Sequence, residues 1–171
     1  MSTAVPVVVE QDAGEAWWFG GGLFTFKVTS EQSGGAYILI EDTAYRGKTT
    51  PLHSHPGHDE TFYVIDGELL LHIDGAEQTA SRGSIAAIPR GVAHAFLVTS
   101  ESARWIAFIT PGEASAEAFF RQAGEPAPNR AAPPAGTPLD IEGIVEAGKQ
   151  TGFMHMLGPP PFKREAQPSR S

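Results

Sequence analysis

The sequence contains no cysteine and few basic residues. Without thiols, disulfides and thiolate metal sites are excluded, so any metal must be held by nitrogen and oxygen ligands. Only 12 lysines and arginines accompany 20 aspartates and glutamates, which gives a formal net charge of −8. Nucleic-acid binding needs a basic stripe that meets the phosphates, so we expect no nucleic-acid partner.

Long hydrophobic runs are also missing. No apolar run approaches the roughly 20 residues that a membrane-spanning helix requires. Residues 1–11 show no basic stretch followed by an apolar core, so we expect no signal peptide. These features predict a cytoplasmic protein without a membrane partner, which the absence of cysteine also fits. The 171 residues suffice for one sizeable core and are few for two.

Turn-forming residues are abundant, with 19 glycines and 14 prolines. Between residues 23 and 111 they separate short apolar segments at intervals of about 8–12 residues, which is typical of an all-β sandwich or barrel. Asp66-Gly67 is a strong hairpin signal between two of these segments. The predicted strands span 23–29, 36–40, 61–65, 69–73, 84–88, 93–98 and 105–109.

The character of the sequence changes after residue 111. Residues 113–123 are rich in alanine and glutamate and predict a helix that stops at Gly124. A second helix is expected to begin with Thr137 as its N-cap and Pro138 in the first position.

Residues 153–157 are either a final short strand or a segment that covers the barrel. We find no internal repeat, so a single barrel is expected. The predicted organisation is an N-terminal arm (1–22), a β-barrel (23–111) and a C-terminal helical extension with a tail (112–171).

The residues richest in chemistry lie between Gly47 and Gly67. His53 and His55 are two positions apart, so on a strand both imidazoles project from one face. A Pro-Gly break then lets the chain return with Glu60 beside them, and His94 begins a later strand. Three imidazoles and one carboxylate that converge in a small barrel suit a divalent transition metal, with coordination positions left open.

Residues 47–67 and 83–94 resemble the two signatures of the cupin family. The matching positions are Gly47, His53, His55, Glu60, Gly67, Gly83, Pro89, Gly91 and His94. The second signature usually ends in asparagine, where this chain has Val98. That asparagine is not a metal ligand, so the departure concerns local packing. The resemblance implies an all-β, cupin-type small β-barrel (a double-stranded β-helix or jelly roll) with C-terminal helices, and the metal ligands His53, His55, Glu60 and His94.

Weaker features resemble bacterial single-domain quercetin 2,3-dioxygenase-like cupins: residues 17–22, the pair Phe119-Phe120 and the segment 158–160. This resemblance implies a metal-dependent dioxygenase that cleaves a flavonol, or a related enol aromatic, with O₂ to a depside and carbon monoxide. Glu60 would then be both a ligand and the catalytic base for the substrate's hydroxyl proton. Nickel, cobalt, manganese and iron all tolerate this ligand set. A homodimer is expected.

Two other functions fit the same residues. A non-redox enzyme (an isomerase, cyclase, lyase or dehydratase) would use the metal as a Lewis acid. A binding protein would hold a small ligand without turnover. The fold does not choose among these functions, because one barrel hosts many chemistries.

Several aromatic residues are candidates for the substrate pocket. Phe62 and Phe96 share strand parity with the ligands, as do Val64 and Val98, and all four should line the cavity. Their roles as ordinary core or as walls around an aromatic substrate stay open, although core filling is the default in a small barrel. The candidate substrate-binding residues are Tyr37, Phe62, Phe96 and Trp105.

Three further histidines have open roles. His58 lies in the turn between ligands, where we favour a surface residue or a hydrogen-bond partner of a ligand over a substitute ligand. His72 has the opposite strand parity from its apolar neighbours and is expected to be outward or half-buried. The role of His155 is undecided.

Overall fold

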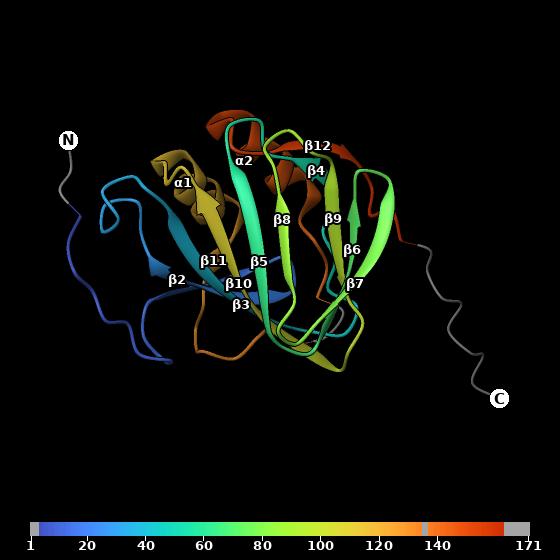
Figure 1. Cartoon of the computed structure of the whole chain (residues 1–171), viewed down its shortest axis with the longest axis horizontal. Helices are drawn as coiled ribbons and strands as arrows, with labels where there is room; N and C mark the ends of the chain where they lie inside the picture. The colour runs from blue at the N-terminus through green and yellow to red at the C-terminus, as the bar shows by residue number, and fades with distance from the viewer. Residues whose placement is uncertain (1–3, 135–136, 163–171) are drawn as a thin grey trace.

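The computed structural model describes residues 4–134 and 137–162, which form two antiparallel sheets that face each other, with two helices at one end (Figure 1). The larger sheet contains, in spatial order, β11 (Glu125–Pro126), β1 (Glu15–Phe19), β2 (Gly22–Val28), β3 (Ile38–Tyr45), β10 (Ser102–Thr110), β5 (Asp59–Asp66) and β8 (Ile85–Ile88). The smaller sheet contains β12 (His155–Gly158), β4 (Leu52–Ser54), β9 (His94–Val98), β6 (Glu68–Ile73) and β7 (Ala76–Ser81). This is the double-sheet arrangement of a jelly roll.

The core lies between the sheets because inward and outward residues alternate along the strands. In β10, Trp105 and Ile109 are fully buried, whereas Phe108 points to the other face and is only partly buried. The hairpin predicted at Asp66-Gly67 is wrong, because β5 lies in the larger sheet and β6 in the smaller one, and the chain crosses between the sheets at this turn. There Gly67 has φ 77° and packs so closely on the backbone of Ser102 that a side chain would overlap it.

Two strands of at least five residues were not predicted. β1 lies within the predicted N-terminal arm and pairs antiparallel with β2, from Glu15 opposite Phe26 to Phe19 opposite Gly22. β7 follows Asp74-Gly75 and pairs with β6 at the edge of the smaller sheet. Its sequence carries no apolar alternation because most of its side chains are exposed, so hydrophobic periodicity could not reveal it.

Two helices follow the sheets. Helix α1 (Ala114–Ala123) ends at Gly124, as predicted. The predicted start of the second helix is wrong, because α2 (Ile141–Thr151) begins after Asp140. The Asp140 carboxylate accepts a hydrogen bond from the Gly143 N–H at 2.9 Å and caps the helix, whereas the Thr137 hydroxyl donates to the Pro134 carbonyl. Residues 163–171 of the predicted tail lie outside the described residues.

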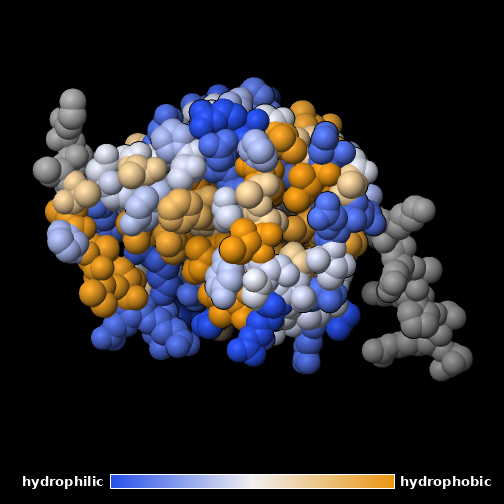
Figure 2. All heavy atoms as spheres, in the orientation of Figure 1, coloured by the Kyte–Doolittle hydropathy of each residue, from blue (hydrophilic) through white to orange (hydrophobic). Residues whose placement is uncertain are grey.

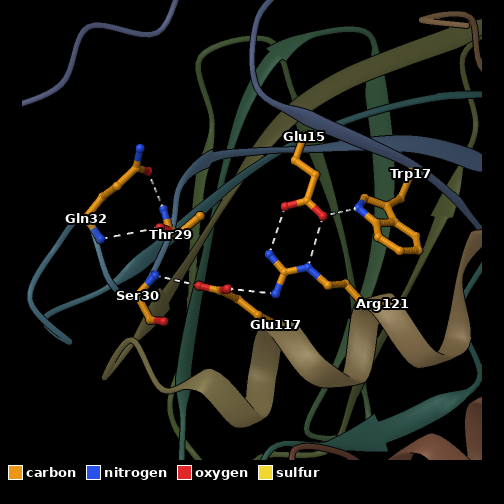
Figure 3. Close-up of polar contacts among 7 residues, drawn as sticks. All are labelled: Glu15, Trp17, Thr29, Ser30, Gln32, Glu117 and Arg121. Atoms are coloured by element: carbon orange, nitrogen blue, oxygen red, sulfur yellow. Dashed lines mark hydrogen bonds and ion pairs between the residues drawn. The ribbon is translucent and has the colours of Figure 1, made fainter. Parts of the chain in front are cut away.

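Arg121 ties α1 to the larger sheet (Figure 3). Its guanidinium donates to both carboxylate oxygens of Glu15 on β1, at 3.0 and 2.8 Å, and to Glu117 one helical turn earlier, at 3.0 Å. Glu117 also accepts from the Ser30 backbone N–H in the loop after β2. Two charged pairs and a loop contact therefore fix the helix across the ends of β1 and β2.

The outer surface mixes polar and apolar side chains (Figure 2). Apolar side chains emerge over β5 and β8, where Tyr63 and Ile85 face each other across the strands and are both exposed. In the part of the chain that the structure describes, none of the helices has the length and apolar character needed to traverse a bilayer.

Candidate metal centre

His53, His55, Glu60 and His94 come together inside the fold, as predicted from their spacing. Each offers one ligand atom, and these four atoms lie within 4.8 Å of one another. The imidazole centroids are 4.2–5.3 Å apart, and all four side chains are at most 7% exposed.

Strand pairing explains this convergence. His53 on β4 lies directly opposite His94 on β9 in the smaller sheet, and His55 follows β4 by one residue. Glu60 lies near the start of β5 in the larger sheet, which faces them. The cluster therefore spans the space between the two sheets.

Each histidine is oriented by a backbone carbonyl. The Nδ1 atoms lie 2.8 Å from the carbonyl oxygen of Pro51 for His53, 3.0 Å from that of Phe153 for His55 and 2.9 Å from that of Val92 for His94. A carbonyl oxygen can only accept, so each Nδ1 must carry the hydrogen. This tautomer leaves Nε2 for the centre of the cluster, which is the usual arrangement of histidine metal ligands.

Electrostatics favour a neutral imidazole at His53 and an ionised carboxylate at Glu60, whereas His94 must release a proton before it can bind a cation. Burial, reinforced by the neighbouring His94 and His55, holds the pKa of His53 well below its usual value, so its ring is neutral. Burial by itself raises the pKa of Glu60, but hydrogen bonds from His55 and His94 outweigh it and keep that pKa below the usual range. Burial likewise lowers the pKa of His94, but the Glu60 carboxylate, 3.1 Å away, raises it overall.

The donor set fits a divalent transition metal. Three imidazole nitrogens and one carboxylate oxygen are borderline and hard ligands, which suit nickel, cobalt, manganese or iron. The carboxylate supplies negative charge in a buried place, where a cation would balance it. The cluster could therefore bind a metal ion.

The cluster opens into a cavity with aromatic walls. His53, His55 and Glu60 line this cavity, whereas His94 lies behind them. Phe62, Phe96 and Trp105 line it as predicted, with Phe96 edge-on to both other rings at centroid distances of 6.0 and 5.1 Å. The cavity therefore provides a mostly apolar space beside the histidine–glutamate cluster.

Tyr37 is not among the described residues that line the cavity, although it was a candidate. Its ring stacks on Phe108, with centroids 4.8 Å apart, and Phe108 points away from the inward-facing Trp105 on β10. Val64 and Val98 do not line the cavity either but are fully buried in the core. Strand parity predicts which face of the sheet a side chain projects from, but not whether that side chain borders a cavity or packs in the core.

The three remaining histidines differ in how far they are buried. Neither of the two roles favoured for His58 is found in the described part of the chain: its side chain is only 4% exposed and packs edge-on against Phe153, so it is not a surface residue. Neither of its ring nitrogens has a hydrogen-bond partner among residues 4–134 and 137–162. His72 is half-buried, as expected. His155 is exposed on β12 opposite Ser54.

The C-terminal part of the chain supplies one wall of the site, so residues 153–157 both cover the site and contribute to a strand, which were the two alternatives that the sequence left open. Phe153 is 1% exposed, its ring lies 4.3 Å from that of His55, and its carbonyl orients His55. Phe119 and Phe120 of α1 and Ile144 of α2 line the same cavity. A strand signal at 153–157 was present, and β12 does pair with β4. Nothing in the local sequence, however, assigned Phe153 to a histidine about one hundred residues earlier.

Comparisons with known proteins agree with this geometry. A family model described as "Cupin domain" matches residues 42–109. Quercetin 2,3-dioxygenase of Bacillus subtilis (strain 168) is 28% identical over 123 residues, which are 72% of this chain and 36% of that enzyme. The chain thus corresponds to little more than a third of that relative's length.

Solved structures share the fold at lower identity. A predicted oxalate decarboxylase from Thermotoga maritima has a TM-score of 0.53 at 21% identity, covering 60% of this chain and 97% of that one. The polyketide cyclase RemF from Streptomyces resistomycificus also has a TM-score of 0.53, at 20% identity, covering 65% of this chain and 81% of that one. These likenesses confirm the predicted cupin-type β fold with C-terminal helices.

Proposed function

We propose, from the matched cupin domain model and the similarity to a quercetin 2,3-dioxygenase, that this chain is a metal-dependent cupin dioxygenase. Its substrate would be a flavonol or a related enol-containing aromatic, cleaved by O₂. The observation that carries the proposal is the buried three-histidine, one-glutamate cluster that opens into a cavity with aromatic walls. The similarity to the Bacillus subtilis quercetin 2,3-dioxygenase supports the choice of substrate.

The four cluster residues would hold the metal, which supplies Lewis acidity and redox chemistry when bound. Glu60 has a second role in the proposal. Its carboxylate is ionised at neutral pH, as a proton acceptor must be, and its position beside the cavity is what suits it to take the enol proton of the substrate. It borders the cavity, so the substrate hydroxyl can reach it.

The aromatic walls would position the substrate. Phe62, Phe96 and Phe153 are each at most 6% exposed and border the cavity. Apolar aromatic walls favour an aromatic ring and exclude water from the reacting atoms.

The proposal is tested by oxygen consumption. The protein is loaded separately with nickel, cobalt, manganese and iron, and O₂ uptake and carbon monoxide release are measured with quercetin. We expect uptake in at least one metal form and none in a His94→Ala variant treated in the same way. Metal-loaded protein that binds quercetin but consumes no O₂ in any form would refute the dioxygenase proposal.

The same assay separates the alternatives. Product that forms under strictly anaerobic conditions would identify a non-redox metal enzyme, because a dioxygenase cannot turn over without O₂. Tight binding without product in mass spectra would identify a binding protein.

A further inference from the structure

We propose that Lys48 and Trp105 form a subsite for a phenolic oxygen of the ligand in the same cavity, with Asp42 as the residue that positions Lys48. The inference rests on the proposed use of the cavity as a substrate pocket, but not on the reaction performed there. Lys48, Asp42 and Trp105 all line this cavity together with the histidine–glutamate cluster.

Lys48 places a cation in the cavity wall. Its side chain is buried, and its ammonium donates to Asp42 Oδ1 at 3.0 Å and to the Phe19 carbonyl oxygen at 3.3 Å. The ammonium also lies 5.7 Å from the ring centroids of both Phe96 and Trp105. An ammonium has three N–H donors, so one is left over from the hydrogen bonds made within the described part of the chain.

Trp105 supplies a second donor. Its side chain is 0% exposed, and its indole N–H has no hydrogen-bond partner within the described ranges. The other two tryptophans do have partners, since Trp17 donates to Glu15 and Trp18 to the Ala131 carbonyl. A buried donor without an acceptor costs free energy, and a ligand oxygen in the cavity would remove that cost.

Gly22 packs directly against the side chain of Lys48. A Cβ at this position would overlap the Nζ atom of Lys48. Gly22 has no positive φ, so a larger residue here would be opposed by the Lys48 side chain and not by backbone strain. A buried ion pair can generally be replaced by apolar residues without loss of stability. The pair of Lys48 and Asp42 is therefore better explained by what it presents to the cavity than by stability.

A phenolic hydroxyl matches the polarity of this subsite. Its oxygen can accept from the third N–H of Lys48 and from the Trp105 indole, and its hydrogen can be donated to the Asp42 carboxylate. An alkyl group would leave the donors unpaired. A ligand with a metal-binding enol and a separate phenol would engage the cluster and the subsite together.

The test compares three flavonols by anaerobic calorimetry on the metal-loaded full chain: 3-hydroxyflavone, 3,7-dihydroxyflavone and 3,4′-dihydroxyflavone. We expect at least one dihydroxyflavone to bind about tenfold tighter than 3-hydroxyflavone, the gain expected of one hydrogen bond to a charged donor. Lys48→Met should abolish most of this preference. Trp105→Phe should reduce this preference while it leaves the ion pair of Lys48 and Asp42 intact. The subsite can therefore still be tested if Lys48→Met fails to fold.

Lys27→Met is the matched control. Lys27 is also buried, but its ammonium donates to the backbone carbonyls of Glu10, Gln11 and Ala13, and it does not line the cavity within the described structure. This variant should keep the tenfold preference.

Equal affinity of all three flavonols for the wild-type protein, or the same preference in all the variants, would overturn the subsite. If no flavonol binds, the flavonol proposal fails, and the subsite is then judged with phenol as the probe. Phenol should shift the Trp105 indole N–H resonance downfield in the wild-type protein and less in Lys48→Met. The absence of a shift would overturn the subsite by itself.

Discussion

Replacing Phe153 by alanine tests whether the C-terminal segment holds the candidate metal ligands in place. The Phe153 ring is 1% exposed and contacts the rings of His55, His58 and Phe119 at centroid distances of 4.3–5.3 Å. Removal of a buried phenylalanine side chain costs about 3–5 kcal/mol. Because Phe153 borders an existing cavity, we expect the lower end, about 3 kcal/mol. For a chain of this size that corresponds to a decrease in Tm of roughly 6–12 °C.

The metal affinity should decrease as well, since the carbonyl that orients His55 belongs to the same residue. Loss of such support typically lowers metal affinity by a factor of 10–100, and we expect roughly tenfold because the carbonyl itself remains. Thermal unfolding followed by circular dichroism measures the decrease in Tm, and competition with a chelator measures the metal affinity. Phe108→Ala is the control. It removes a half-buried ring on the outer face and should leave metal affinity within about twofold. A variant of Phe153 that loses stability but binds metal as tightly as the wild-type protein would refute the positioning role.

Three other perturbations have defined outcomes. His94→Ala should sharply lower metal occupancy as measured by elemental analysis, because it removes a buried ligand; full occupancy would contradict the ligand assignment. Glu60→Gln keeps the side-chain volume and should retain some metal but lose most O₂ uptake, whereas unimpaired uptake would exclude Glu60 as a base. Arg121→Met should lower the free energy of unfolding by about 1 kcal/mol, because its pairs with Glu15 and Glu117 are partly exposed. The hydrogen bond from Arg121 lowers the pKa of Glu15, so the stability that this pair contributes is present above the unfolded pKa of about 4.5 and is lost as the pH falls through the lowered folded pKa. Chemical denaturation should therefore show a weaker loss of stability in acid for Arg121→Met than for the wild-type protein.

The cluster of candidate metal ligands could be predicted from the sequence because two of its histidines are two positions apart and all four members occupy the spacing of the cupin signatures. His53 and His55 need only a strand and its extension to lie on one side, and the hydrogen-bond register then places His94 opposite His53. The stop of α1 at Gly124 could also be predicted, and so could the turn at Gly67, although the strands on either side of that turn belong to different sheets and form no hairpin. Each depends on the conformational preference of one or two residues.

Features that depend on distant contacts could not be predicted. The start of α2 was misplaced because two capping residues competed, and the better cap at Asp140 became apparent only from its bond to Gly143. Tyr37 and Trp105 were both candidate substrate-binding residues. In the structure Tyr37 stacks on Phe108 at the outer face, whereas Trp105 borders the cavity. The contact of Phe153 with His55 joins residues 98 positions apart, and no periodicity encodes it.

The pairing of β12 with β4 also sets an order of events during synthesis. The strand that carries His53 and the loop that carries His55 emerge from the ribosome long before Phe153 and β12, which complete the wall around them. Until those residues appear, the inner face of the smaller sheet is open on that side. This side of the pocket can therefore close only after residues 153–158 have been made, and a truncated chain that ends after α1 would leave His55 without the ring and the carbonyl of Phe153.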